Sequence, residues 1–186
     1  MESNLFDLSG KTALITGGSR GIGLAVAKGL ARHGANITLV ARTEKQLEQA
    51  QRQIQEETNK HTWTFPFDLA QTDQIEDLFE NIIKETKGIN ILVNCAGITR
   101  RAPAEDINLN DWGQVIDVNL TAVFAISQAF CRHRKHIGAG GKPATLMAGK
   151  IINIGSLMCH AARPTNTAYA SSKGGILMLT KSLAVE

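Results

Sequence analysis

Five short runs of apolar and β-branched residues recur along the chain, each bounded by polar residues, glycine or proline. Their apolar character is continuous rather than alternating, which is typical of strands that are buried on both faces of a parallel sheet. Pro66, near the end of the third run, limits how far that strand can pair. The runs predict strands at Thr12–Thr16, Ile37–Ala41, Trp63–Phe67, Ile91–Val93 and Ile151–Ile154.

Segments with helical periodicity lie between these runs. The first spans about residues 21–33, and a second, polar segment spans Glu44–Thr58 with Thr43 as its expected N-cap. A third has one apolar stripe, formed by Ile75, Leu78, Phe79, Ile82 and Ile83. Strands alternating with helices predict right-handed crossovers and a doubly wound, Rossmann-like parallel sheet in a three-layer α/β/α fold. We expect residues 1–186 to form this single domain.

A glycine-rich stretch at residues 138–149 precedes the fifth run. Its composition predicts a surface loop that enters the fifth strand from its amino end. Ligands of doubly wound folds bind at the opposite, carboxyl edge of the sheet. We therefore assign no catalytic role to this stretch.

The composition is that of an ordinary globular protein, with 43% hydrophobic and 20% charged residues. We expect no membrane span, because no apolar run approaches the roughly 18 residues that a span requires. The amino terminus has no basic stretch followed by an apolar core, so we expect no secretory signal. Three widely spaced cysteines argue against a disulfide framework and favour a reducing, cytoplasmic location.

The net charge of +3 is modest, and the densest basic cluster lies at residues 132–136, near the end of a predicted helix. We interpret this cluster as a solvated face that complements the helix dipole. It has no interleaved aromatic residues for base stacking, so we expect no nucleic-acid partner. The sequence also predicts no metal site.

The first predicted strand runs directly into TGGSRGIG at residues 16–23, where Gly17, Gly21 and Gly23 are spaced G-x-x-x-G-x-G. Such glycines let the backbone turn tightly and let the phosphates of a dinucleotide approach a helix N-terminus. A glycine-rich turn alone is a weak signal, but its place after the first strand strengthens it. We expect the turn, with Ser19 and Ile22, to bind a dinucleotide.

The second predicted strand ends at Ala41 and Arg42, without the acidic residue that would bind the ribose hydroxyls of NAD. Arg42 and Arg20 could instead clamp a 2′-phosphate, because the planar guanidinium donates several charge-assisted hydrogen bonds. Two exposed surface arginines are the alternative interpretation. We expect NADP(H) to be preferred over NAD(H).

Tyr169 and Lys173 lie four residues apart in a predicted helix, so their side chains share one face. A tyrosine hydroxyl, with a reference pKa near 10, is a poor base at neutral pH. A neighbouring ammonium favours the phenolate by roughly 4 kcal/mol for a 4 Å pair at an effective dielectric of 20. Such a pair suits general acid–base chemistry, and the lysine can also reach a cofactor ribose. The same spacing is common in ordinary helices, so the residues around the pair decide whether it is catalytic.

Other polar residues gather at the same predicted edge of the sheet. Ser156 stands just past the fifth strand, 13 residues before Tyr169, where its hydroxyl can stabilise charge that develops on a substrate oxygen. The segment NCAG at residues 94–97 follows the fourth strand, and Asn119 sits between two helical segments. All of these except Asn119 fall where this fold binds its ligands.

In order and spacing, these stretches resemble the short-chain dehydrogenase/reductase family. The matching stretches are TGGSRGIG at 16–23, Asp68, NCAG at 94–97, Asn119, Ser156 and YASSK at 169–173. The resemblance runs from about Leu8 to Glu186 and implies an oxidoreductase that transfers a hydride between NAD(P)(H) and a carbonyl or secondary alcohol. Two features depart from the family: Cys95 replaces the usual second asparagine, and the glycine-rich stretch lengthens the gap before Ser156.

The resemblance also implies roles for individual residues. Tyr169 would donate or accept the proton, Ser156 would orient the carbonyl, and Lys173 would lower the pKa of the tyrosine and bind ribose. Asn119 would hold a water in a proton relay. Further cofactor contacts would come from Asp68 against the adenine, Leu69, Asn94 (which also braces the central strands), Ala96 and Gly97.

Within the family, three stretches resemble the sugar-acid branch, which includes gluconate 5-dehydrogenase and 2-deoxy-gluconate 3-dehydrogenase. These stretches are LFDLSGK at 5–11, AGITRR at 96–101 and VFAISQA at 123–129. Arg100 and Arg101 follow the fourth strand, where either could pair with a substrate carboxylate such as that of gluconate or 5-keto-gluconate. They could equally be exposed or serve subunit contacts. A 3-oxoacyl-carrier-protein reductase is the alternative, with the same arginines receiving an acidic carrier protein.

The chain ends at Val185 and Glu186 within a predicted helix. Members of the family continue with further strands and a substrate-covering segment, so we expect a chain that is incomplete at its carboxyl end. A non-catalytic nucleotide-binding fragment is therefore a second hypothesis, which an intact-mass measurement would test. The presence of every implied catalytic side chain favours the enzyme. The resemblance also implies a homotetramer that contacts through the helices around Asn119 and Tyr169.

Overall fold

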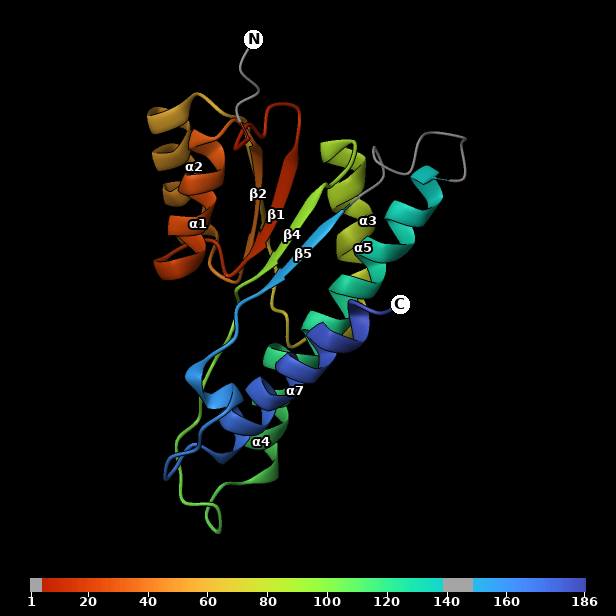
Figure 1. The fold of residues 1–186 in the computed structure, drawn as a ribbon. Coiled ribbons are helices and arrows are strands. Elements are labelled where there is room, and N and C mark those ends of the chain that lie inside the picture. The colour runs from red at the N-terminus through yellow and green to blue at the C-terminus, as the bar shows by residue number, and fades with distance from the viewer. Residues whose placement is uncertain (1–4, 139–148) are drawn as a thin grey trace.

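A parallel β-sheet forms the centre of the computed structural model, which describes residues 5–138 and 149–186. Within these ranges the sheet has five strands in the order β3-β2-β1-β4-β5 (Figure 1). The strands are β1 (Thr12–Thr16), β2 (Asn36–Ala41), β3 (Thr62–Pro66), β4 (Ile91–Asn94) and β5 (Lys150–Asn153). Each boundary lies within one residue of its prediction, and Pro66 is the last residue of β3. The predicted parallel, doubly wound sheet is confirmed.

Helices cover both faces of this sheet, which confirms the predicted α/β/α layers (Figure 1). One face carries α1 (Gly21–Arg32) and α2 (Glu44–Thr58), and the other carries α3 (Ile75–Thr86) and α5 (Ala122–Gly138). Because successive side chains of a strand point to opposite faces, β1 supplies both cores. Ala13 and Ile15 pack under α1 and α2, whereas Leu14 packs under α3 and α5.

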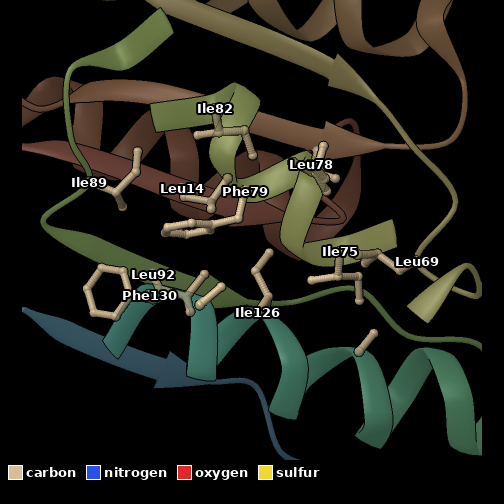
Figure 2. Close-up of a cluster of buried hydrophobic side chains, with 13 residues drawn as sticks. Leu14, Leu69, Ile75, Leu78, Phe79, Ile82, Ile89, Leu92, Ile126 and Phe130 are labelled. Atoms are coloured by element: carbon tan, nitrogen blue, oxygen red, sulfur yellow. The ribbon is translucent and has the colours of Figure 1, made fainter. Parts of the chain in front are cut away.

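The core on the α3 side contains four of the five residues of the predicted apolar stripe. Ile75, Leu78, Phe79 and Ile82 are buried, and Ile83 is partly buried beside them. Figure 2 shows these side chains meeting Leu14 and Leu92 of the sheet and Ile126 and Phe130 of α5. The helix thus seals one face of the strands whose carboxyl ends carry the candidate chemistry.

Two helices extend beyond the carboxyl ends of the strands (Figure 1). The first, α4 (Leu109–Ile116), runs through a π-helical turn, η2 (Asp117–Thr121), into α5. The second, α7 (Thr167–Leu183), packs against α4 and η2. A short 3₁₀ turn, η3 (Leu157–Cys159), connects β5 toward α7 and contacts it.

The continuous helical stretch Leu109–Lys135 is long and apolar enough to cross a membrane, by length and composition. Polar residues interrupt this stretch, so it is not an unbroken apolar run, and the expectation of no membrane span stays a prediction. Half of its most apolar window is buried inside the structure, where it packs against α3 and α7. A buried core helix meets the same criterion, so this stretch is weak evidence for a membrane span.

Three local expectations have different outcomes. Thr43 is the N-cap of α2, as predicted, but its side chain forms no capping hydrogen bond, and its carbonyl accepts hydrogen bonds from the helix instead. The basic cluster is only partly solvated, because Arg132 pairs with Glu76 at 2.7 Å and Arg134 donates to the Ile89 carbonyl at 3.3 Å. Residues 139–148 of the glycine-rich stretch lie outside the described residues.

Candidate active site

The strand order reverses at β1, because the chain moves outward through β2 and β3 and then returns to place β4 on the other side of β1. Open α/β sheets bind ligands in the crevice outside the carboxyl ends of the strands at such a point. A cavity of about 650 Å³ lies here. We call it the crevice cavity. The β1–α1 turn and the segments that follow β2, β3 and β4 line it, together with Ile154, Gly155 and α7.

The glycine turn lines this cavity and accepts no side chains at two positions. Gly17 has φ +67°, and a Cβ on it would lie 2.8 Å from the Ala96 Cα. A Cβ on Gly23, in the first turn of α1, would lie 2.3 Å from the Gly17 carbonyl oxygen. Both positions therefore require glycine. The absence of side chains at these glycines leaves space beside the N-terminus of α1, which we call the cradle. A helix N-terminus of this kind suits the phosphates of a dinucleotide.

Gly23→Ala is expected to destabilise the fold by about 1–3 kcal/mol, because the turn must shift to admit the added methyl group. It should also weaken dinucleotide binding. Gly29→Ala is the matched control in the same helix, since its Cβ would meet nothing within 4 Å and alanine favours a helix over glycine by about 1 kcal/mol. Urea denaturation compares the two variants, and equal free energies of unfolding would contradict the cradle geometry.

The predicted phosphate-clamping arginines both reach the crevice cavity. Arg20 lines it from the glycine turn, and Arg42 lines it from the end of β2. Asp68 and Leu69, after β3, line it as predicted, and Asp68 is the single carboxylate among the described lining residues. The Asp68 carboxylate accepts a hydrogen bond from the Ala70 amide at 3.1 Å, which fixes this segment.

Tyr169 and Lys173 both project from α7 into the wall of the crevice cavity. The Lys173 Nζ donates to the Ile154 carbonyl at 2.7 Å and lies 5.8 Å from the centroid of the Tyr169 ring. Lys173 is only 6% exposed, and this burial lowers the pKa of its ammonium. The structure therefore brings the predicted pair together with the cation held next to the phenol ring.

A second cavity, of about 400 Å³, shares Tyr169, Gly97 and Ile98 with the first. We call it the outer cavity, and Ser156 lines it. The Ser156 Oγ accepts a hydrogen bond from the Met158 amide at 3.2 Å, so its own hydrogen can be donated elsewhere. Tyr169 thus stands between a cavity with a dinucleotide cradle and a cavity with a hydroxyl donor.

Asn119 occupies the π-helical turn η2, a type of helix defect that is frequent at functional sites. Its buried amide accepts from the Ile98 amide at 2.8 Å and donates to the Ile98 carbonyl at 2.9 Å. It also donates to Ser172 Oγ at 3.0 Å, and Ser172 donates to the Tyr169 carbonyl at 2.7 Å. Asn119 therefore ties the segment after β4 to the tyrosine helix, while lining neither cavity among the described residues.

Asn94 lies away from both cavities, whereas its neighbours Ala96 and Gly97 line the crevice cavity. The Asn94 Nδ2 donates to Asn153 Oδ1 at 2.8 Å and to Ser127 Oγ at 3.2 Å. These bonds join β4 to β5 and α5. The geometry matches the bracing role implied for Asn94 and gives it no direct place in the cavity.

The two candidate substrate arginines separate in the structure. Arg101 lines the outer cavity. Arg100 instead forms an ion pair with Asp111 at 3.4 Å and donates to Gln114 at 3.2 Å. Neighbouring residues of an irregular segment point in different directions, which no periodic pattern could have indicated.

Several lining residues were missed by the sequence reasoning. Cys95, Ile154 and Gly155 line the crevice cavity beside motifs that were identified, and burial raises the pKa of the Cys95 thiol. Arg163 and Asn166 line the outer cavity from a segment without a recognisable motif. Adjacency to a motif was the available signal for the first group, and the second group had none.

Comparison with known proteins places this geometry among dehydrogenases. Residues 11–186 match the family model described as short chain dehydrogenase. The gluconate 5-dehydrogenase of Gluconobacter oxydans (strain 621H) is 41% identical over 183 residues, which cover 98% of this chain and 68% of that protein. The 3-oxoacyl-[acyl-carrier-protein] reductase FabG of Chlamydia trachomatis is 32% identical over 179 residues, which cover 96% of this chain and 68% of that protein.

A solved structure shares both the fold and much of the sequence. The gluconate 5-dehydrogenase from Burkholderia cenocepacia J2315, in complex with NADP and tartrate, has a TM-score of 0.85 and 39% identity. The similarity covers 97% of this chain and 67% of that one. The fold and much of the sequence therefore recur in a relative whose solved structure contains NADP.

Proposed function

Because this chain belongs to the short-chain dehydrogenase family of NAD(P)-dependent oxidoreductases acting on CH–OH groups, we propose that it interconverts the ketone and alcohol of a sugar acid with NADP(H). The most suitable ketone is 5-keto-gluconate. One observation carries the proposal: Tyr169 stands between the crevice cavity and the outer cavity and lines both. An acid–base residue in that position reaches both a cofactor and a substrate.

The proposed reaction uses four side chains of this protein. When bound in the crevice cavity, the dinucleotide supplies the hydride for reduction of the carbonyl carbon. Ser156 donates a hydrogen bond to the carbonyl oxygen, and Tyr169 transfers its hydroxyl proton to that oxygen as negative charge develops there. The Lys173 ammonium stabilises the phenolate that remains. Asn119 acts indirectly, because its amide holds the tyrosine helix through Ser172 and the segment after β4 through Ile98. The Tyr169 proton is restored from solvent, and oxidation of the alcohol reverses these steps.

The proposed cofactor contacts follow the lining of the crevice cavity. The glycine turn holds the phosphates, Asp68 faces the adenine, and Lys173 binds the nicotinamide ribose. The cavity volume of about 650 Å³ falls in the range of cavities that hold small molecules and cofactors. Arg20 and Arg42 bind the 2′-phosphate that distinguishes NADP from NAD.

The arginine pair gives a direct test of cofactor preference. We expect a lower KM for NADPH than for NADH, and we expect Arg20→Ala combined with Arg42→Ala to raise the KM for NADPH about tenfold or more. The KM for NADH should change little, because NADH lacks the 2′-phosphate. Arg52→Ala is the control, since Arg52 is exposed on α2 and lies 4.0 Å from the Glu48 carboxylate. Equal preference of the parent for both cofactors would refute the clamp.

The alternative substrate is a 3-oxoacyl group on a carrier protein. The relative from Chlamydia trachomatis, which is named as a reductase of that substrate, supports this alternative. Purified protein assayed with NADPH against 5-keto-gluconate and against an acetoacetyl thioester separates the two. We expect turnover of the sugar acid to exceed that of the thioester. The reverse order would favour the carrier-protein reductase, and turnover of neither would refute both substrate assignments.

We further propose that the protein acts in the cytoplasm as a homotetramer. The three cysteines are free in the described structure, which suits a reducing compartment. Exposed apolar side chains on α5, β5 and α7 supply surface for subunit contacts: Phe124, Ile152 and Met178 are 44%, 45% and 58% exposed. Light scattering measures the assembly, and a monomer in solution would contradict the tetramer.

A further inference from the structure

The outer cavity carries two positive charges beside the proposed proton donor. Arg101 lines it from the segment after β4, and Arg163 lines it from the segment between η3 and α7. No carboxylate is present among the described residues that line this cavity. Across residues 5–138 and 149–186, neither guanidinium takes part in an ion pair or side-chain hydrogen bond. Two arginines without a protein counter-charge favour an anionic ligand.

A partly buried hydrogen bond connects the two arginine-bearing segments. Thr99 Oγ1 donates to Asn166 Oδ1 at 3.2 Å, and both residues line the outer cavity. Asn166 is 2% exposed, so the acceptor end of this bond lies in the protein interior. Arg101 follows Thr99 by two residues, and Arg163 precedes Asn166 by three. The bond therefore limits how far the two arginines can move apart.

The segment that presents Arg163 is also conformationally strained. Thr165, between Arg163 and Asn166, has φ +62°, a region that β-branched residues rarely adopt. Such outliers persist only where the surrounding structure holds them, and they cluster at ligand-binding positions. Here the strained residue directs the chain from the cavity-lining Arg163 into the buried anchor at Asn166.

We infer that Arg163, together with Arg101, binds the carboxylate of the substrate, so that the outer cavity selects sugar acids over neutral sugars of the same length. The planar guanidinium suits this task because it can donate two parallel hydrogen bonds to a carboxylate. The inference rests on the proposed reaction, since it orients the substrate with its ketone toward Ser156 and Tyr169. Arg100 has no part in it, because Asp111 and Gln114 already engage that side chain.

Calorimetric binding to the NADPH complex tests this inference without turnover, because an alcohol cannot react with the reduced cofactor. The probes are D-gluconate and sorbitol, which differ only in the carboxylate that sorbitol replaces by a hydroxymethyl group. We expect Arg163→Ala to weaken gluconate binding about tenfold or more and to leave sorbitol binding unchanged. Arg163→Lys should fall between the parent and Arg163→Ala, because lysine keeps the charge but lacks the planar fork. Arg100→Ala is the charge-matched control and should bind gluconate as the parent does.

Unchanged gluconate affinity in Arg163→Ala would overturn the inference. A parent protein that binds sorbitol as tightly as gluconate, or binds neither, would overturn it as well. The proposed reaction fails separately: if Arg163→Ala loses gluconate affinity as expected but the parent never turns over 5-keto-gluconate, the carboxylate site stands and the reaction is wrong.

Discussion

Tyr169→Phe is expected to lower kcat by about 10²- to 10⁴-fold, the usual contribution of a general acid or base. The phenyl ring keeps the shape of the side chain between the two cavities but has no proton to give. Binding of NADPH should remain nearly unchanged, because the glycine turn and the arginines hold most of the cofactor in the proposed arrangement. Steady-state kinetics and fluorescence titration with NADPH measure the two quantities separately.

A matched control for this variant lies two residues further along α7. Ser171 is exposed and lines neither cavity among the described residues, so Ser171→Ala should keep the parental rate. Retained turnover in Tyr169→Phe would remove the proposed proton donor. Loss of both turnover and NADPH binding would instead indicate a structural role for the ring.

Lys173→Met is expected to lower kcat on the order of 10²-fold, because it removes the charge that stabilises the developing phenolate. It should also weaken NADPH binding, since the same ammonium is proposed to bind ribose. The change also removes the hydrogen bond from Lys173 to the Ile154 carbonyl, which should lower stability by about 1–3 kcal/mol. Lys181→Met, at an exposed position near the end of α7, is the control that should leave kcat unchanged.

The same lysine makes stability depend on pH. Burial lowers the pKa of Lys173, so the folded protein releases this proton at a lower pH than the unfolded chain does. Between those two pKa values the unfolded chain binds more protons, and the free energy of unfolding must rise with pH. Urea denaturation should show this rise in the parent and its loss in Lys173→Met.

Much of the fold could be predicted because its determinants are local. Continuous apolar runs indicated the parallel strands, and the stripe on α3 indicated which helix face meets the sheet. The glycine turn was also predictable, since Gly17 and Gly23 sit where any side chain would collide with backbone. Tyr169 and Lys173 share a face because helical geometry fixes residues four apart.

The rest of the site depends on irregular segments. Helix and strand periodicity does not predict where the side chains of such segments point. Arg100 and Arg101 were equivalent in sequence, yet one pairs with Asp111 and the other lines the outer cavity. Arg163 lines that cavity from an irregular segment that contains the strained Thr165 and is bonded through Asn166 to Thr99. Thr43 is the N-cap of α2 as its position indicated, but the sequence could not show that its side chain forms no capping bond.

The most direct test of the central claim follows the hydride itself. NADPH carrying deuterium at the transferable position of its nicotinamide ring is incubated with the protein and 5-keto-gluconate, and the product is examined by mass spectrometry and NMR. We expect a sugar-acid alcohol with deuterium on the carbon that carried the ketone. Absence of the alcohol, or an alcohol without deuterium at that carbon, would contradict hydride transfer between NADP(H) and a sugar acid in this site.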